Sequence, residues 1–89
     1  MHEMSVAMEV CRIVESRVPR EAVGRVVTVG IDVGDESGVE PDSLQFWLES
    51  LLASPPFDSA KPAITRVSGN VLRVSYLEVQ EGGFEASGT

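Results

Sequence analysis

The chain has 89 residues, one cysteine, one histidine and a formal net charge of −7 at pH 7. This length fits one domain, since domains usually have roughly 100 to 200 residues. One cysteine and one histidine exclude an internal disulfide and the tetrahedral Cys/His set of a structural zinc site. The negative charge makes nucleic acid and anionic membranes poor partners because both repel it. With neither a membrane-spanning apolar run nor a recognisable secretory signal, we expect a cytoplasmic chain.

A first helix is predicted from Ser5 to Val18. Its apolar residues recur at intervals of three and four, the spacing of an amphipathic helix: Val6, Val10, Ile13 and Val14. Pro19 should end this helix or open one short further turn, because proline lacks the backbone donor that a continuing helix needs.

A strand is predicted from Val26 to Val33, where the sequence is nearly all β-branched. Side chains alternate between the two faces of a strand. We therefore expect one strongly buried face, made of Val27, Val29, Ile31 and Val33. Residues 34–39 are rich in glycine and acids and are expected to form a loop.

A second helix is predicted to start at Glu40 and Pro41, since proline suits the first helical position. Its apolar residues follow at helical spacing: Leu44, Trp47, Leu48 and Leu51, with Phe46 and Leu52 widening the stripe. We interpret Phe46 and Trp47 as core residues rather than a stacking surface. Pro55 and Pro56 end the helix.

Two further strands are predicted at 63–67 and 71–79, joined as a hairpin by residues 68–70. The apolar positions of the last strand change parity along its length, which indicates a bulge or burial on both sides. Together the elements predict an α+β fold with two helices packed on one face of a mixed three-stranded sheet. We expect the first strand to run parallel to the second, and the third antiparallel to the second. A single domain over 1–81 and a flexible tail over 82–89 complete the prediction.

His2 is the only histidine and lies one residue from the start of the sequence. A catalytic base must be held rigidly, so we do not expect an enzyme. The same position suits a metal ion. The amine of Met1, the next amide nitrogen and the His2 imidazole form fused chelate rings with the planar nitrogen geometry that Ni(II) and Cu(II) favour, and Glu3 adds an amide and a carboxylate. Alternatively, His2 is a solvated terminal residue.

Two segments narrow this choice: the opening MHEMSVA at residues 1–7 and VGIDVGDESGVEPDSL at residues 29–44. In order and spacing they resemble the HypA/HybF family of hydrogenase nickel-incorporation proteins. Less specific similarities follow at residues 56–60, 69–74 and 77–79, so that the resemblance extends to about residue 81.

The resemblance implies a nickel metallochaperone that works with the GTPase HypB, loads the large subunit of nickel–iron hydrogenase and in some organisms assists urease. It also implies two helices against a mixed three-stranded sheet. Met1, His2 and Glu3 match the family's nickel site residue by residue. Glu40 occupies an acidic position from which some members bring a carboxylate to the metal. Equally, Glu40 can serve as a stabilising charge at a helix N-terminus.

The sequence departs from the family between the second and last predicted strands, where the family carries a zinc module with two Cys-x-x-Cys pairs. Here only residues 68–70 join the strands, and no zinc site is expected. Two functions remain open: a Ni(II)-binding maturation factor lacking the zinc module, and a metal-independent module that docks a maturation partner. Natural loss and engineered deletion of the module both fit the sequence.

Overall fold

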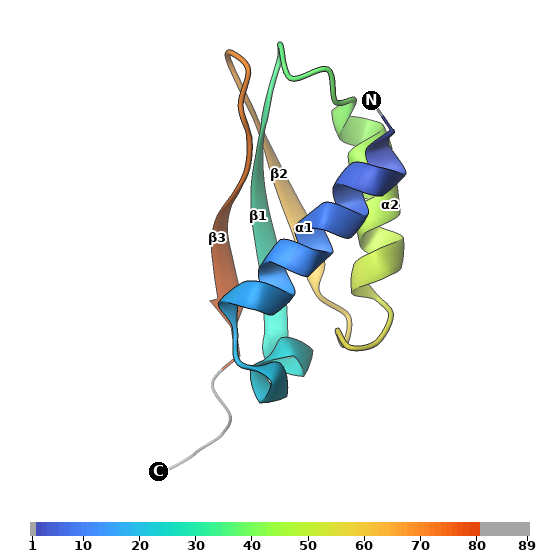
Figure 1. The fold of residues 1–89 in the computed structure, drawn as a ribbon, viewed down its shortest axis with the longest axis vertical. Coiled ribbons are helices and arrows are strands. Elements are labelled where there is room, and N and C mark those ends of the chain that lie inside the picture. Colours follow the sequence, from blue (N-terminus) through green and yellow to red (C-terminus); the bar gives the residue numbers. More distant parts are fainter. Residues whose placement is uncertain (1, 81–89) are drawn as a thin grey trace.

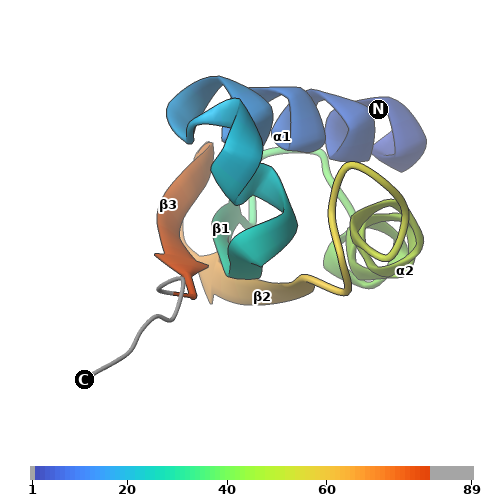
Figure 2. The ribbon, with the colours of Figure 1, turned by 90° about the horizontal axis from the view of Figure 1, so that it is seen from below.

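A computed structural model describes residues 2–80. Its elements are α1 (Glu3–Arg17), the 3-10 helix η1 (Arg20–Arg25), β1 (Val26–Gly34), α2 (Pro41–Leu52), β2 (Lys61–Val67) and β3 (Leu72–Val79). Both α-helices cover the same face of a mixed three-stranded sheet, which confirms the predicted α+β class (Figures 1 and 2). The predicted tail at 82–89 and residue 81 lie outside the described residues, so the domain boundary stays a prediction.

Helix α1 forms where apolar residues follow the helical period. Its buried residues are spaced three, four and seven positions from the first: Ala7, Val10, Cys11 and Val14. This spacing places them on one face of the helix. The helix ends at Arg17 because Val18 precedes Pro19 and takes the extended conformation usual before proline. Pro19 leads into η1, which confirms the expected short further turn.

Helix α2 starts with Pro41 at its first position and Glu40 as its N-cap. Leu44, Leu48 and Leu52 are fully buried. The prediction that Phe46 belongs to the core is wrong, because its side chain is 63% exposed. A helical turn of about 100° per residue places Phe46 on the side opposite Leu44 and Leu48. It packs edge-on against the partly buried Trp47, with ring centroids 5.3 Å apart.

The strand order is β2-β1-β3, with β1 parallel to β2 and antiparallel to β3. The predicted hairpin is therefore wrong, because β3 pairs with β1 instead of β2. Strand β1 is the most buried of the three, and the central place gives it a partner on each edge. The connection over residues 68–71 crosses the end of β1, where the Gly34 N–H donates to the Val71 carbonyl (2.6 Å) and the Glu36 N–H to the Gly69 carbonyl (2.9 Å).

Gly34 makes this close crossing possible. A Cβ at this position would overlap the carbonyl oxygen of Gly69 and lie 2.6 Å from the backbone nitrogen of Val71. The crossing is also held by Asp35, whose Oδ1 accepts a hydrogen bond from the Gly69 N–H (2.8 Å). A side-chain-free residue at the end of the central strand is thus a requirement of this topology.

Two register shifts interrupt the pairing of β1 with β3. Gly30 lies opposite Tyr76 and Ile31 opposite Val74, which confirms the predicted bulge in the last strand and places it at residue 75. A second shift lies in β1 between Val26 and Thr28. It reverses the alternation there, so Val26 is buried and Val27 is 42% exposed. The expectation that Val27 belongs to the buried face is wrong for this reason.

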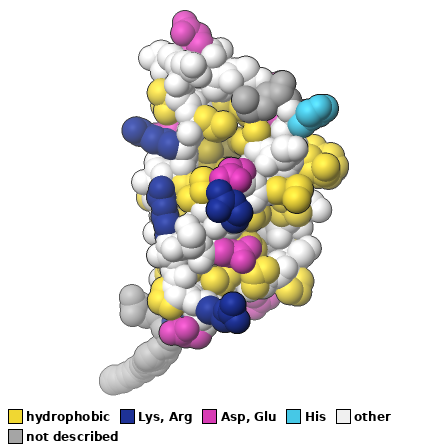
Figure 3. Space-filling model, in the orientation of Figure 1, with side chains coloured by type: hydrophobic (Ala, Val, Ile, Leu, Met, Phe, Trp, Pro, Cys, Tyr) yellow, Lys and Arg dark blue, Asp and Glu magenta, His cyan; other side chains and the backbone are white. Residues whose placement is uncertain are grey.

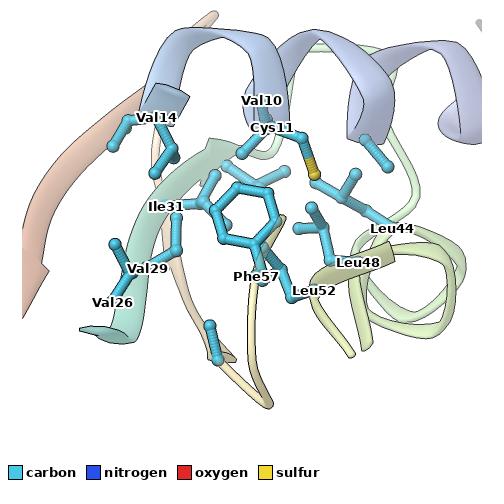
Figure 4. Packing of buried hydrophobic residues seen from close by; sticks show 14 of the residues in the cluster. Val10, Cys11, Val14, Val26, Val29, Ile31, Leu44, Leu48, Leu52 and Phe57 are labelled. Carbon is cyan, nitrogen blue, oxygen red and sulfur yellow. The ribbon is translucent and has the colours of Figure 1, made fainter. Parts of the chain in front are cut away.

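The core lies between the helices and the sheet (Figure 4). It is formed mainly by aliphatic side chains: Val10, Cys11 and Val14 of α1, Val26, Val29 and Ile31 of β1, Leu44, Leu48 and Leu52 of α2, and Phe57 of the loop that follows. On the opposite face of the sheet, the absence of a side chain at Gly30 leaves room for the ring of Tyr76. None of the helices formed within residues 2–80 has the length and apolar character needed to cross a membrane.

Candidate metal centre

The start of α1 and the start of α2 lie next to each other at one end of the molecule (Figure 1). The backbone N–H of Glu40 donates a hydrogen bond to Oε2 of Glu3 (2.9 Å), although 37 residues separate the two in the chain. Three of the four predicted nickel ligands, His2, Glu3 and Glu40, are thereby at the same end of the fold. The fourth, Met1, lies outside the described residues.

His2 is the N-cap of α1, and its side chain makes no capping hydrogen bond. The imidazole is exposed and stands at the molecular surface (Figure 3). The carbonyl of His2 accepts the first helical bond, from the Val6 N–H (3.1 Å). The first N–H groups of a helix have no acceptor within it. The amide nitrogens of His2 and Glu3 are thus outside the helical hydrogen-bond ladder, and loss of their protons to a metal would break none of its bonds.

Glu40 has an observed structural role. Its Oε1 accepts a hydrogen bond from the Ser43 N–H (3.1 Å), which caps α2. A carboxylate at this end also interacts favourably with the helix dipole. The interpretation of Glu40 as a helix-capping charge is therefore confirmed, while its contact with a metal stays a prediction.

The hydrogen bond from the Glu40 N–H is the main cause that holds the pKa of Glu3 below its ordinary value of 4.5. A carboxylate whose pKa is lower in the folded than in the unfolded chain stabilises the fold above the unfolded value and loses that contribution as pH falls through the folded one. We expect Glu3→Gln to flatten the fall in melting temperature below pH 4.5.

Thermal unfolding followed by circular dichroism at a series of acidic pH values measures this effect. Glu36→Gln, at an exposed position in the loop before α2, is the matched control and should keep the wild-type pH profile. An unchanged profile for Glu3→Gln would show that the ionisation of Glu3 does not contribute to stability.

Side chains alone do not form a metal site in the described part of the chain. Among residues 2–80, no three or more His, Cys, Asp or Glu residues converge into a group able to hold an ion. A nickel site around His2 would therefore draw on backbone nitrogens as well as side chains. The available donors, an imidazole with amide nitrogens and nearby carboxylates, suit Ni(II), which accepts planar nitrogen and oxygen sets.

Cys11 lies apart from this set of donors. It is buried in the core on α1, with the sulfur among aliphatic side chains (Figure 4). Burial, with a smaller contribution from the charge of Glu15, raises the pKa of its thiol to about 11. A thiol that stays protonated at neutral pH is a poor metal ligand and a poor nucleophile. Cys11 is therefore a small residue of the core.

The sequence matches, over residues 1–78, the family described as "Hydrogenase/urease nickel incorporation, metallochaperone, hypA". The chain belongs to this family, which confirms the resemblance inferred from its two motifs. Among similar proteins, the hydrogenase maturation factor HypA of Geobacter metallireducens is 39% identical over 70 residues, covering 78% of this chain and 60% of the relative.

Two other relatives carry the same name. HypA of Dechloromonas aromatica is 36% identical over 69 residues, covering 78% of this chain and 61% of the relative. HypA of Rhizobium leguminosarum bv. viciae is 39% identical over 69 residues, with the same two coverages. The chain thus spans about three fifths of the length of these relatives.

Proposed function

We propose that the chain binds Ni(II) at its start and delivers it to a nickel–iron hydrogenase during maturation. The ligands proposed are the amine of Met1, the amide nitrogen and imidazole of His2, and Glu3, and we propose the Glu40 carboxylate as a further donor. The observation that supports this most is the hydrogen bond between the Glu40 N–H and the Glu3 carboxylate. It fixes the start of α1, and with it the neighbouring His2, against the loop that carries Glu40.

Nickel is the cargo in this proposal, and the exposure of the site suits its transfer. His2 lies at the surface and its side chain makes no capping hydrogen bond, so a partner can reach the bound ion from outside. Binding requires that the imidazole and the amide nitrogens lose protons. Nickel affinity should therefore fall as the pH is lowered. Acidification, or a partner site with stronger ligands, would then release the ion.

The proposed partners are a HypB-like GTPase and the hydrogenase large subunit, and the proposed compartment is the cytoplasm. The relatives are named hydrogenase maturation factors, which supports partners of this kind. We propose no catalytic role. The only histidine is an exposed N-cap residue, and the only cysteine is a buried thiol with a raised pKa.

A metal-independent docking module is the second candidate, and the connection between β2 and β3 favours it. Residues 68–71 join the two strands directly, with no inserted module at this point. Because this sequence has one cysteine, it cannot supply the paired cysteines of a zinc site. Under this alternative, the helices and sheet bind the maturation partner and the start of the chain binds no metal.

Transfer of nickel distinguishes the two candidates. The nickel-loaded chain is mixed with a nickel-free hydrogenase large subunit, the two are separated, and nickel is measured in each. Delivery predicts that nickel moves from the wild-type chain and that the His2→Ala chain carries none to move. The docking module predicts that the two proteins bind equally well with nickel present or chelated, and that no nickel is transferred.

A further inference from the structure

Strand β3 is an edge strand with an outer side that no other described strand pairs with. It has eight residues and is unusually apolar for an exposed edge: Leu72 is 38%, Tyr76 46% and Val79 36% exposed. Proteins usually protect such edges, because their free N–H and C=O groups readily pair with another strand. The free edge of β3 can therefore pair with a strand of another chain.

The residues of β3 divide between the two faces of the sheet in an unusual way. Four apolar residues lie opposite buried valines and the isoleucine of β1, on the face covered by the helices: Leu72, Val74, Leu77 and Val79. Three others lie opposite Asp32, Gly30 and Thr28, on the uncovered face: Arg73, Tyr76 and Glu78. The bulge at residue 75 separates the two halves, so the parity of the apolar positions changes there.

This division makes β3 complementary to a second copy of itself. When two β3 strands run antiparallel about a point between residues 75 and 76, Leu72 meets Val79 and Val74 meets Leu77. Both apolar pairs then lie on the helix face of a shared sheet. In the same register Arg73 meets Glu78, on the uncovered face. Residues that face each other across an antiparallel pair must lie on the same face of the sheet. The two members of each pair are an odd number of residues apart, so in a strand without the bulge they would lie on opposite faces.

The charges also agree with this register. A two-fold axis creates two pairs of Arg73 with the partner's Glu78, each an opposite-charge pair directly across the strands. Within one chain, Nε of Arg73 already donates to Oδ2 of Asp32 (3.0 Å). A guanidinium has five N–H donors, so Arg73 can bind both carboxylates.

A hollow beside the edge provides space for the partner's side chains. It has a volume of about 320 Å³ and lies between α1 and β3, lined mainly by Val6, Val10 and Ile13 on one side and by Leu72 and Val74 on the other. Figure 3 shows hydrophobic side chains on the surface between α1 and β3. In the proposed register the partner's Leu77 and Val79 would lie directly beside Val74 and Leu72, and so at the opening of the hollow.

We propose that two copies of this chain associate through β3, forming one continuous six-stranded sheet around a two-fold axis. The surface is distinct from the candidate metal centre, and the proposal does not depend on nickel.

Sedimentation velocity and light scattering on the whole chain without metal, at physiological ionic strength, test this. We expect a dimer whose dissociation constant rises at least tenfold in Glu78→Arg, because Arg73 then faces arginine twice. Asp58→Arg, the same change of charge at an exposed site outside the sheet, is the matched control and should dimerise as the wild type does.

Mixing two weakened variants tests the register itself. Arg73→Glu, combined with Asp32→Asn so that two acids do not face each other, should be weakened as a homodimer. Mixed with Glu78→Arg, it should form a heterodimer of near wild-type affinity, since both cross-strand pairs regain opposite charges. Circular dichroism confirms that each variant is folded. A wild-type chain that stays monomeric, a dimer insensitive to Glu78→Arg, or a mixture that does not restore association would each overturn the proposal.

Discussion

Replacing His2 by alanine is expected to abolish most nickel binding. The imidazole is the only histidine ligand available, and its loss removes a chelate ring as well as a donor. Removing even the outer hydrogen-bond partners of a metal site weakens binding by roughly 10- to 100-fold, so loss of a direct ligand should exceed this range. Isothermal titration with Ni(II) gives the dissociation constants. An affinity equal to that of the wild type would show that nickel binds elsewhere.

Two further measurements complete this test: the stability of His2→Ala and the nickel affinity of a second variant, Glu40→Gln. His2→Ala should change the free energy of unfolding by no more than about 0.5 kcal/mol, because the side chain is exposed and makes no capping hydrogen bond. Glu40→Gln keeps an oxygen that can accept from the Ser43 N–H and removes only the charge. A weaker nickel affinity in Glu40→Gln would add Glu40 to the ligands, and an unchanged affinity would leave it as a helix cap alone.

Gly34→Ala is expected to be among the most destabilising single substitutions in the chain. The new methyl group would overlap the Gly69 carbonyl, which belongs to the backbone and cannot turn aside as a flexible side chain can. To make room, the crossing over 68–71 must move away from β1, which weakens the hydrogen bonds that join Gly34 to Val71 and Glu36 to Gly69. We expect a loss of about 3 kcal/mol, the upper part of the range for overpacking.

Gly24→Ala is the matched control for this substitution. A Cβ at Gly24 would meet only the Pro56 carbonyl oxygen, at an ordinary contact distance of 3.7 Å. Chemical denaturation should therefore show a change of less than about 1 kcal/mol for Gly24→Ala. Equal stability losses in the two variants would contradict the role assigned to Gly34 at the strand crossing.

The helices and the strand β1 could be predicted because each has a strong local signal. The spacing of Val10 and Val14 marks α1, and Pro41 marks the start of α2 at its observed position. Phe46 shows the limit of such reasoning: it is apolar and adjoins a buried stripe in the sequence, but the helical angle turns it outward.

The sheet order could not be predicted from local signals. Three residues between two apolar segments are typical of a hairpin, and only the contacts of the complete sheet show that residues 68–71 cross the end of β1. The glycine at position 34 is the one sequence feature that points to this crossing, because a glycine in a strand often marks a close approach of another backbone segment. The exposure of Val27 depends on a bulge in β1 that nothing in its uniform β-branched sequence reveals.

The candidate site was predicted from a resemblance rather than from residue chemistry alone. Met1, His2 and Glu3 are consecutive, so a motif can identify them. The contact between Glu3 and the backbone of Glu40 depends on how α1 and α2 pack, and neither residue type nor spacing shows it. That contact is the structural reason to treat Glu40 as part of the same site.

The most direct test of the terminal nickel site is a Ni(II) titration of two chains that have identical side chains from Met1 onward. One begins at Met1, and the other carries the three residues Gly-Ser-Gly before it. The extension turns the amine of Met1 into an amide and moves the free amine too far from His2 to share one set of fused chelate rings with the imidazole. We predict a much weaker nickel affinity for the extended chain. Equal affinities would contradict the proposed site.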